Sequence, residues 1–550
     1  MNERSPAANL NRQTFIGLCL ALFVVAFTLG VIPPMMPAIV REFKASMGFI
    51  QSVLVLCSLV TAASTPTTEN LSNVYGRKRV LVAGLILYAI GLVVAALSPS
   101  PGWLAFGYAL LLGVAASPLI DSSWALMDFL YDDEAERKAG GVMVLASIAG
   151  GISGGLSAGF IASQMSWRVA FLPQLVLLPV IYGLTRVAPY HQPPVTLPVD
   201  WIGGIFSLLG LGLTLLGLSL ASEYGWWEPK QIFEIRGFVV PPFPLSIAPI
   251  LMASGLVFLG VFFFWQRRAA QKGLPSLFRA GVLRRKVFVL GALTAILHSI
   301  AVAGVQFNLF QFIPTVLKLN SFQTALAVFP YTLATLIAFF TGTYNRRIQT
   351  IASRHLIQAG LALVCAGVLF LRSAISPQMT ALSLFPALFI MGLGSGLFFT
   401  SIAGVAFSAA QPHEKAEASG VYNPLQNVGS SLGRGIFGTL LITVFSTDLV
   451  DDVSQAFGGT LSPVTRQMAI NQLQSVIQTF SQEERRDFLD GLPASVRTQL
   501  NAMFPDAAMR ALQFSLLSLL ALVILGLILS FALPKRAAKP GRDVVNTMPS

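Results

Sequence analysis

Apolar segments long enough to cross a bilayer recur along almost the whole chain, separated mostly by short polar connections. The first covers residues 15–40 and the last covers residues 510–533. A helix of about 20 apolar residues spans the hydrocarbon core of a membrane. Hydrophobic residues make up 54% of the 550-residue chain and charged residues only 11%, which excludes a water-soluble globule of this size. The sequence therefore predicts an all-α polytopic membrane protein.

The pattern predicts fourteen spans, so both termini are expected on the same side of the membrane. The spans are expected at residues 15–40, 48–70, 79–98, 103–130, 140–162, 168–187, 201–221, 246–266, 287–315, 322–344, 355–372, 380–409, 417–446 and 510–533. Lys and Arg gather in alternate connections, most strongly in residues 267–286, and the other connections hold few or none. Because cytoplasmic loops collect Lys and Arg, the termini are predicted to be cytoplasmic. The same topology accounts for the net charge of +12 without a nucleic-acid partner.

An internal duplication is visible in the sequence. Residues 112–116 (LGVAA) return as residues 391–395 (MGLGS), and the acidic-basic turn at 134–141 resembles the one at 414–420. Two similar halves around a midplane cavity are typical of secondary transporters. The predicted domains are a six-helix bundle (1–188), a linker with two extra helices and a basic cytoplasmic loop (189–286), helices of the second bundle (287–446), an extracytoplasmic helical insertion (447–509), and the last helix with a cytoplasmic tail (510–550).

Short motifs near the ends of several spans point to one family. They are residues 76–79 (GRKR) after the second span, 167–171 (WRVAF) entering the sixth, 200–203 (DWIG) entering the seventh and 418–423 (ASGVYN) entering the thirteenth. In this order they resemble the fourteen-helix drug:proton antiporters of the EmrB/QacA type, within the major facilitator superfamily. The resemblance implies the major facilitator fold, two six-helix bundles plus two extra central helices. It also implies multidrug-type efflux of amphipathic or hydrophobic small molecules by proton antiport and alternating access.

The chain departs from the family pattern at several functional positions. The first span contains no Asp or Glu, and Ala109 stands where the family has a membrane-embedded Arg. The glycines of the fifth span are still predicted to pack helices; they are Gly150, Gly151, Gly154, Gly155 and Gly159. A cytoplasmic gating loop is predicted after the second span, formed by Glu69, Asn73, Gly76, Arg77, Lys78 and Arg79.

Asp121 is the candidate proton-coupling residue, because it lies well inside the fourth span. A charged residue at this depth is costly unless it faces a cavity or a partner. Burial favours the neutral form of a carboxyl, which suits a proton carrier. Trp124 and Asp128 share its helix face, and Asp128 is expected in solvent near the cytoplasmic end. The alternative for Asp121 is a neutral, hydrogen-bonded structural carboxyl.

Polar residues of the second half are candidates for the substrate cavity. They are His298, Gln306 and Asn308 in the ninth span, and Asn423, Gln426, Asn427 and Arg434 in the thirteenth. His298 could titrate, but a hydrogen-bonding role towards a neighbouring helix is favoured. Arg434 has two interpretations of equal weight: a salt bridge between the halves, or a contact with an anion or a polar headgroup in the translocation path.

Several signatures of other protein classes are missing. There is no phosphate-binding loop, no His-Glu-x-x-His or Gly-x-Ser-x-Gly motif and no cysteine pair, so neither an enzyme nor a metal or cofactor site is expected. The expected partners are the bilayer of a bacterial-type cytoplasmic (inner) membrane, a small-molecule substrate and a proton. Two alternatives stay open: an uncoupled facilitator or lipid/metabolite exporter, and a non-transporting receptor or assembly subunit.

Overall fold

The computed structural model describes most of the chain as long helices. It describes residues 6–43, 47–130, 133–186, 200–227, 234–235, 238–239, 245–271, 285–319, 321–408, 415–456, 458–459, 461–479, 491 and 493–535. The chain divides into two compact units, Met1–Leu277 with Ser475–Asp487, and Phe278–Gln474 with Phe488–Ser550.

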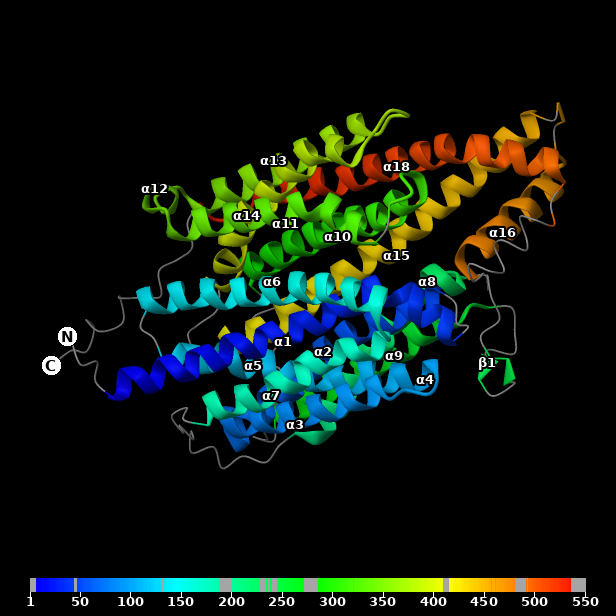
Figure 1. Ribbon diagram of the computed structural model, residues 1–550. Helices are drawn as coiled ribbons and strands as arrows, with labels where there is room; N and C mark the ends of the chain where they lie inside the picture. The colour runs from blue at the N-terminus through cyan, green and yellow to red at the C-terminus, as the bar shows by residue number, and fades with distance from the viewer. Residues whose placement is uncertain are drawn as a thin grey trace. The chain divides into compact units, whose positions relative to one another are not determined.

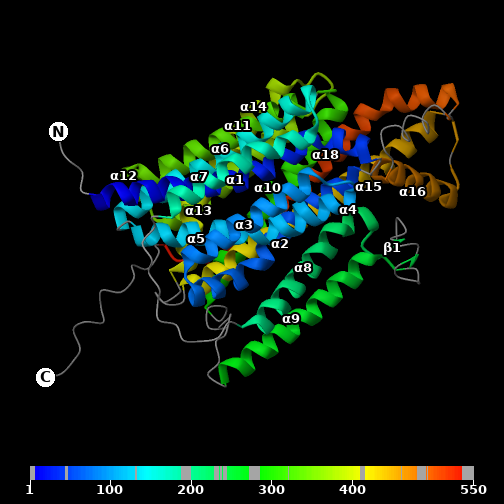
Figure 2. The same cartoon turned by 60° about the horizontal axis from the view of Figure 1, so that its bottom comes forward.

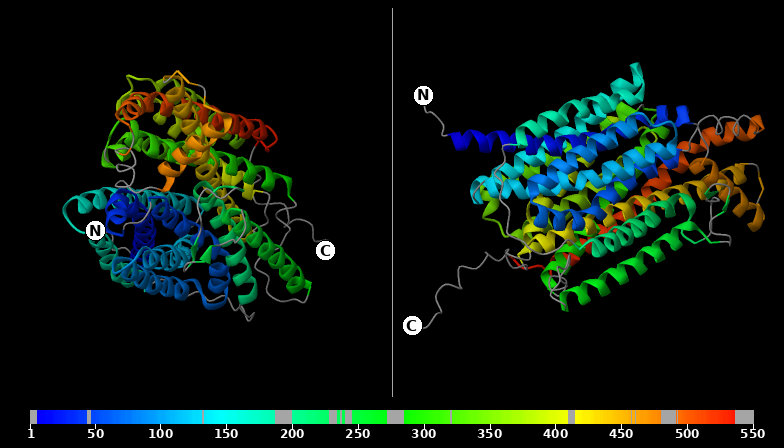
Figure 3. Two further views of the ribbon diagram at one scale, coloured as in Figure 1. Left: turned by 90° about the vertical axis from the view of Figure 1, so that its right-hand side faces the viewer. Right: turned by 90° about the horizontal axis from the view of Figure 1, so that it is seen from below.

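The first unit contains eleven helices and one short hairpin among its described residues. The elements are α1 (Pro6–Phe43), α2 (Met47–Tyr75), α3 (Arg77–Ala96), α4 (Pro101–Leu104), η1 (Ala105–Leu111), α5 (Leu112–Leu130), α6 (Asp133–Gln164), η2 (Trp167–Phe171), α7 (Leu172–Thr185), α8 (Trp201–Tyr224), β1 (Glu234–Ile235), β2 (Phe238–Val239) and α9 (Ile247–Gln271). The hairpin is antiparallel, with Glu234 opposite Val239. Figures 1 and 3 show the blue-to-cyan helices of this unit lying alongside one another as a bundle, and Figure 2 shows α8 and α9 as an adjacent pair.

The second unit repeats the helical character of the first. Its elements are α10 (Lys286–Val316), α11 (Ser321–Tyr344), α12 (Arg346–Gln349), α13 (Ser353–Ala374), η4 (Ala381–Leu384), α14 (Phe385–Phe407), α15 (Lys415–Ala456), α16 (Pro463–Thr479), which begins in this unit, and α18 (Ala494–Ser530). Within it, α10 packs against both α15 and α18, and α14 packs against α11 and α13.

Twelve helices among the described residues are long and apolar enough to cross a membrane, which makes the chain a multi-pass integral membrane protein. The other two predicted spans correspond to α2 and α8, whose apolar stretches are shorter, Leu56–Thr65 and Trp201–Thr214. Every predicted span therefore falls on a helix, and the full count of fourteen crossings stays a prediction.

Two helices extend well beyond their predicted ranges. The thirteenth span was expected to end at residue 446 and the fourteenth to begin at 510, but α15 continues to Ala456 and α18 begins at Ala494. Much of the expected insertion therefore belongs to these two helices, because backbone hydrogen bonding continues past the point where apolar composition ends. A separate helix, α16, lies within the expected insertion, which the sequence predicts to be helical.

Helices α1 and α6 approach each other closely through glycines (Figure 1). A Cβ atom added to Gly150 would overlap with the carbonyl oxygen of Phe23, and one added to Gly154 would overlap with that of Phe27. The three other glycines of the predicted packing face are less crowded, because an added Cβ would meet its nearest neighbour at 3.6–3.8 Å; these are Gly151, Gly155 and Gly159. Close helix approach therefore depends on two of the five positions.

The same contact recurs in the second unit between α15 and α10. A Cβ at Gly429 would lie 2.9 Å from the carbonyl oxygen of Ile296, and one at Gly433 would overlap with that of Ile300. In both units the two glycines are one turn apart, and so are the carbonyls they meet. Equivalent helix pairs thus pack in the same way, as the predicted duplication requires.

Candidate functional site

Asp121 lies on α5, in a cluster of hydroxyl groups supplied by α5 itself and by α2. The Ser117 Oγ atom is 2.9 Å from Asp121 Oδ2 and 2.9 Å from the Thr68 Oγ1 atom. Thr65 Oγ1 lies 3.4 Å from the same Ser117 oxygen. Ser117, Thr65 and Thr68 are buried, and Asp121 is partly buried. Since a hydroxyl has one hydrogen, Ser117 can donate to the carboxylate while it accepts from a threonine.

The Asp121 carboxyl is held by these neutral groups. Among the residues that the structure describes, no Lys, Arg or His forms an ion pair with it. A search of the same residues finds no group of three His, Cys, Asp or Glu side chains that could hold a metal ion. Trp124, one turn further along α5, is partly buried against the core of the first unit. The side chain of Asp128 lies outside the described residues.

A second polar cluster joins α2 to the helix pair α8–α9, and its centre is the buried Asp200. Its Oδ1 atom accepts hydrogen bonds from the Gly203 backbone N–H at 2.8 Å and from Trp265 Nε1 at 3.0 Å. Its Oδ2 atom accepts from Gln266 Nε2 at 2.8 Å. The Asp200 backbone N–H donates to Asn70 Oδ1 at 3.2 Å. One carboxylate therefore caps α8, fixes it to α9 and links the pair to α2.

This hub was only partly visible in the sequence. An Asp directly before an apolar run is an N-cap signal, and Asp200 precedes Trp201 in this way. Nothing local marks Trp265 or Gln266 as its partners, because they lie about 65 positions away.

We expect Asp200→Ala to lower the free energy of unfolding by about 3 kcal/mol, since it removes a cap and leaves buried donors unpaired. Chemical or thermal unfolding of the purified protein in detergent measures this change. Asp506→Ala is the matched control: Asp506 is exposed, so its loss should change the unfolding free energy by less than about 0.5 kcal/mol. Equal effects of the two substitutions would contradict the role of the hub.

The predicted gating loop covers the end of α2 and the start of α3, and only Gly76 lies between the two helices. Gly76 has a φ angle of 89°, a conformation that L side chains rarely adopt. Lys78 Nζ donates to the carbonyl oxygen of Arg186 at 2.6 Å, which connects the loop to the end of α7. Glu69 and Arg77 are partly buried and Arg79 is exposed, whereas the side chain of Asn73 lies outside the described residues. A gating function of this loop stays a prediction.

A cluster at the opposite ends of these helices involves Glu42, which the sequence gave no reason to select. The Glu42 carboxylate forms an ion pair with Arg168 and accepts from Trp167 Nε1 at 2.6 Å. The Arg168 guanidinium also donates to the carbonyl oxygen of Ser98 at 2.7 Å and lies over the Trp167 ring, 4.4 Å from its centroid. Trp167 and Arg168 thus anchor η2 to α1 and to the segment that follows α3.

The polar residues of α10 do not form one site. His298 is buried, with its Nε2 atom 3.1 Å from Ser395 Oγ of α14, and it stacks on Phe398 at 4.2 Å between ring centroids. Asn308 is buried against α18 instead, where its Nδ2 atom donates to Ser515 Oγ at 2.7 Å. These two candidates therefore serve different helix contacts, because ten residues of helix rotate them onto different faces. Gln306 is partly buried.

Arg434 lies near the middle of α15. Its Nε atom is buried and has no hydrogen-bond partner among the described residues. Gln426, on the same helix, is partly buried, while the side chains of Asn423 and Asn427 lie outside the described residues. The backbone of α15 is helical through all four positions, as the predicted stripe requires.

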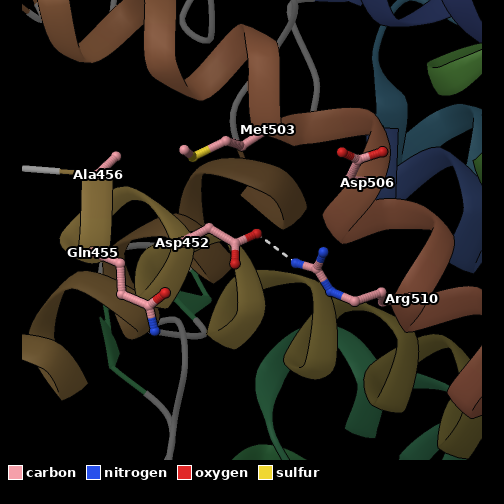
Figure 4. A pocket seen from close by; sticks show the side chains of 6 residues that line it. All are labelled: Asp452, Gln455, Ala456, Met503, Asp506 and Arg510. Carbon is pink, nitrogen blue, oxygen red and sulfur yellow. Dashed lines mark hydrogen bonds and ion pairs between the residues drawn. The ribbon is translucent and has the colours of Figure 1, made fainter.

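A cavity of about 470 Å³ opens where the C-terminal end of α15 meets the N-terminal half of α18. Figure 4 shows its lining by Asp452, Gln455, Ala456, Met503, Asp506 and Arg510. Arg510 pairs with Asp452 and, at 3.2 Å, with Asp448. Nearby, Arg466 of α16 forms a bidentate pair with Asp451 at 2.6 and 2.7 Å, and these hydrogen bonds raise the pKa of the Arg466 guanidinium. The sequence did not predict this cavity.

Apolar helices in two units with repeated glycine contacts define a duplicated, multi-pass membrane protein of the transporter type. Residues 18–433 match the family model of the Major Facilitator Superfamily, and the chain belongs to this superfamily. The prediction of this family from the sequence is confirmed.

Several bacterial proteins are similar to this chain. A "Probable actinorhodin transporter" of Streptomyces coelicolor is 24% identical over 428 residues, which are 76% of this chain and 70% of the relative. The "Multidrug resistance protein Stp" of Mycobacterium tuberculosis is 23% identical over 448 residues, 80% of this chain and 78% of the relative. A puromycin resistance protein of Streptomyces alboniger is 24% identical over 421 residues, 76% of this chain and 79% of the relative.

Two solved structures have a similar fold. The human organic anion transporter MFSD10 (TETRAN) superposes with a TM-score of 0.52 at 13% identity, covering 96% of this chain and all of that chain. The POT family transporter PepTSo gives a TM-score of 0.50 at 12% identity, with 94% and 98% coverage. At such low identity these similarities concern the fold alone.

Proposed function

We propose that this protein is a secondary transporter that exports amphipathic or hydrophobic small molecules by proton antiport and alternating access, with Asp121 as the proton-coupling residue. The observation that carries the coupling is a membrane carboxyl held by hydroxyl groups, with no ion pair among the described residues. Similarity to proteins named for antibiotic transport, multidrug resistance and puromycin resistance supports export. The distribution of Lys and Arg supports termini in the cytoplasm. The bacterial origin of the similar proteins supports a bacterial-type cytoplasmic membrane.

Asp121 differs in its position from every other carboxyl of the twelve apolar spans, because it lies away from the ends of the helices. Within the twelve spans, the remaining acidic residues lie near the ends of α15 and α18 that line the cavity; they are Asp448, Asp451, Asp452 and Asp506. The first span has none, and Ala109, at the position of the family's Arg, is fully buried. If the transported proton binds to a membrane carboxyl away from the aqueous ends of the helices, that carboxyl is therefore Asp121 on α5.

The hydroxyl cluster suits a group that changes its charge. A carboxylate inside a membrane costs about 3 kcal/mol, and protonation removes that cost. Ser117 can donate to the ionised carboxylate or accept from the protonated one, because a hydroxyl does both. Neither state then leaves a buried polar group without a partner. If the substrate binds one protonation state of Asp121 more tightly, proton binding must change the affinity for the substrate by the same factor as substrate binding changes the affinity for the proton. This linkage is the thermodynamic basis of antiport.

Reconstituted vesicles test this function. A proton gradient would be imposed across vesicles exposed to three amphipathic dyes: ethidium (a cation), Nile red (neutral) and 11-(dansylamino)undecanoate (an anion). We expect at least one dye to be concentrated against its gradient with opposite proton movement, abolished by a protonophore. Equilibration without proton movement would replace antiport by an uncoupled facilitator. If none of the dyes moves faster than in protein-free vesicles, a non-transporting receptor becomes the better description.

A further inference from the structure

Arg434 carries a charge at a depth where the second unit offers no opposite charge. The sequence contains no Asp or Glu between Glu234 and Glu414, so α10, α11, α13 and α14 have none. On α15 itself, none lies between Glu417 and Asp448. At 1.5 Å per residue, both are roughly 20 Å or more from Arg434 along the helix axis. The one acidic residue of α18, Asp506, lies with Asp452 at the cavity, beyond Asp448 along α15. The described helices of this unit therefore place no Asp or Glu beside the guanidinium.

The position of Arg434 is fixed by close packing. The preceding residue, Gly433, lies against the carbonyl oxygen of Ile300 on α10, and Gly429 makes the equivalent contact one turn earlier. α15 therefore cannot rotate about its axis without losing these contacts. Ser430 and Gln426 lie one and two turns before Arg434, on a similar face of the helix, and both are partly buried. The guanidinium thus ends a polar stripe on an otherwise apolar helix.

The Arg434 Nε atom is buried and unsatisfied among the described residues. Buried polar atoms of proteins nearly always have a partner, and those of a charged group are the most costly to leave unpaired. An arginine inside a membrane almost always faces the protein interior and finds a counter-charge. A group that is not part of the second unit must then supply it during the transport cycle.

We propose that Arg434 binds the anionic group of the exported molecule, a carboxylate, phosphate or sulfonate on an amphipathic body. This inference rests on the proposed export function and names its substrate class. The planar guanidinium offers parallel N–H donors that match such groups in a bidentate arrangement, and its charge does not depend on pH. In an environment with little water the attraction is stronger than at a surface. The headgroup of an anionic phospholipid presents the same chemistry.

A binding experiment with matched probes tests the site without any gradient. The full-length protein is placed in nanodiscs of zwitterionic lipid, and energy transfer from tryptophan to dansyl is recorded for 11-(dansylamino)undecanoate and for its methyl ester. Signals from empty nanodiscs are subtracted. We expect the wild type to bind the anion at least about tenfold more tightly than the ester, the size expected for a charge-assisted pair.

Variants identify Arg434 as the source of this preference. Arg434→Gln should bind the anion about tenfold more weakly and the ester as before, which also shows that the variant is folded. Arg434→Lys keeps the charge but lacks the parallel N–H donors of the guanidinium, so it should lose an intermediate part of the affinity for the anion. Arg347→Gln, on the exposed α12, is the matched control and should keep the full preference. Adding phosphatidylglycerol to the nanodiscs distinguishes the two possible ligands. If the lipid competes with the probe, the site binds a lipid headgroup; if it does not compete, the site binds a free amphipathic anion.

The inference is overturned if the wild type does not prefer the anion, including the case in which it binds neither probe. It is equally overturned if Arg434→Gln keeps the preference, as expected if the guanidinium is neutralised within the protein. Either result leaves proton antiport of neutral or cationic substrates untouched. Conversely, an intact anion preference in a protein that moves no protons would contradict the proposed coupling and leave the binding site in place.

Discussion

Asp121→Asn is expected to lower substrate-driven proton flux in reconstituted vesicles at least roughly 100-fold, to the level of protein-free vesicles. An amide has nearly the shape of the carboxyl and can still contact Ser117, but it cannot gain or lose the transported proton. The flux is followed with a pH-sensitive dye inside the vesicles after substrate is added.

Three comparisons separate loss of coupling from loss of structure. The variant should still exchange labelled substrate for unlabelled substrate, since that exchange needs no proton movement. Asp121→Glu keeps a titratable group and should retain part of the flux. Asp506→Asn removes an exposed carboxyl at the cavity of α15 and α18 and should leave the flux unchanged. Normal proton flux in Asp121→Asn would rule out this residue as the coupling group.

Gly154→Leu is expected to destabilise the protein by about 3 kcal/mol or more, enough to remove most folded protein. The Cβ atom of the new side chain would overlap with the carbonyl oxygen of Phe27. This oxygen belongs to the backbone, so it cannot move aside as a flexible side chain can. The opposing helix is crowded as well, because a Cβ at Gly30 of α1 would overlap with the carbonyl oxygen of Gly151. α1 and α6 would therefore have to separate.

Yield of monodisperse protein and thermal unfolding in detergent measure this effect. Gly183→Leu is the matched control, since an added Cβ there meets nothing within 4 Å and the residue lies in the apolar helix α7. Gly433→Leu, the equivalent position of the second unit, should be as harmful as Gly154→Leu. A stability of Gly154→Leu close to that of Gly183→Leu would show that the helices can part without cost.

The positions of the membrane helices were predictable, because hydropathy alone marks where the chain enters and leaves the apolar region. The ends of α15 and α18 were not, since polar residues after a span do not stop a helix. Arg510 pairs with Asp448 and Asp452 beyond the predicted spans, and this contact forms only after the two helices meet.

The functional residues divide in a similar way. A carboxyl inside an apolar span selects Asp121 without any structure. The hydroxyl-rich run of α2 contains Thr65 and Thr68, the partners of Ser117, which in turn contacts Asp121. That these hydroxyls lie beside α5 required the packing of α2 against it. For α10 the partners could not be read from the sequence, because His298 meets Ser395 of α14 and Asn308 meets Ser515 of α18 only when these helices pack.

Infrared difference spectroscopy observes the proton on Asp121 directly. Spectra of the reconstituted protein are recorded before and after substrate is added, at a fixed pH near neutrality. If a proton on this carboxyl is exchanged for substrate, the wild type loses the C=O stretching band of a protonated carboxyl, and Asp121→Asn lacks that change. A band that is unaffected by substrate, or that persists in Asp121→Asn, would contradict proton coupling at this residue.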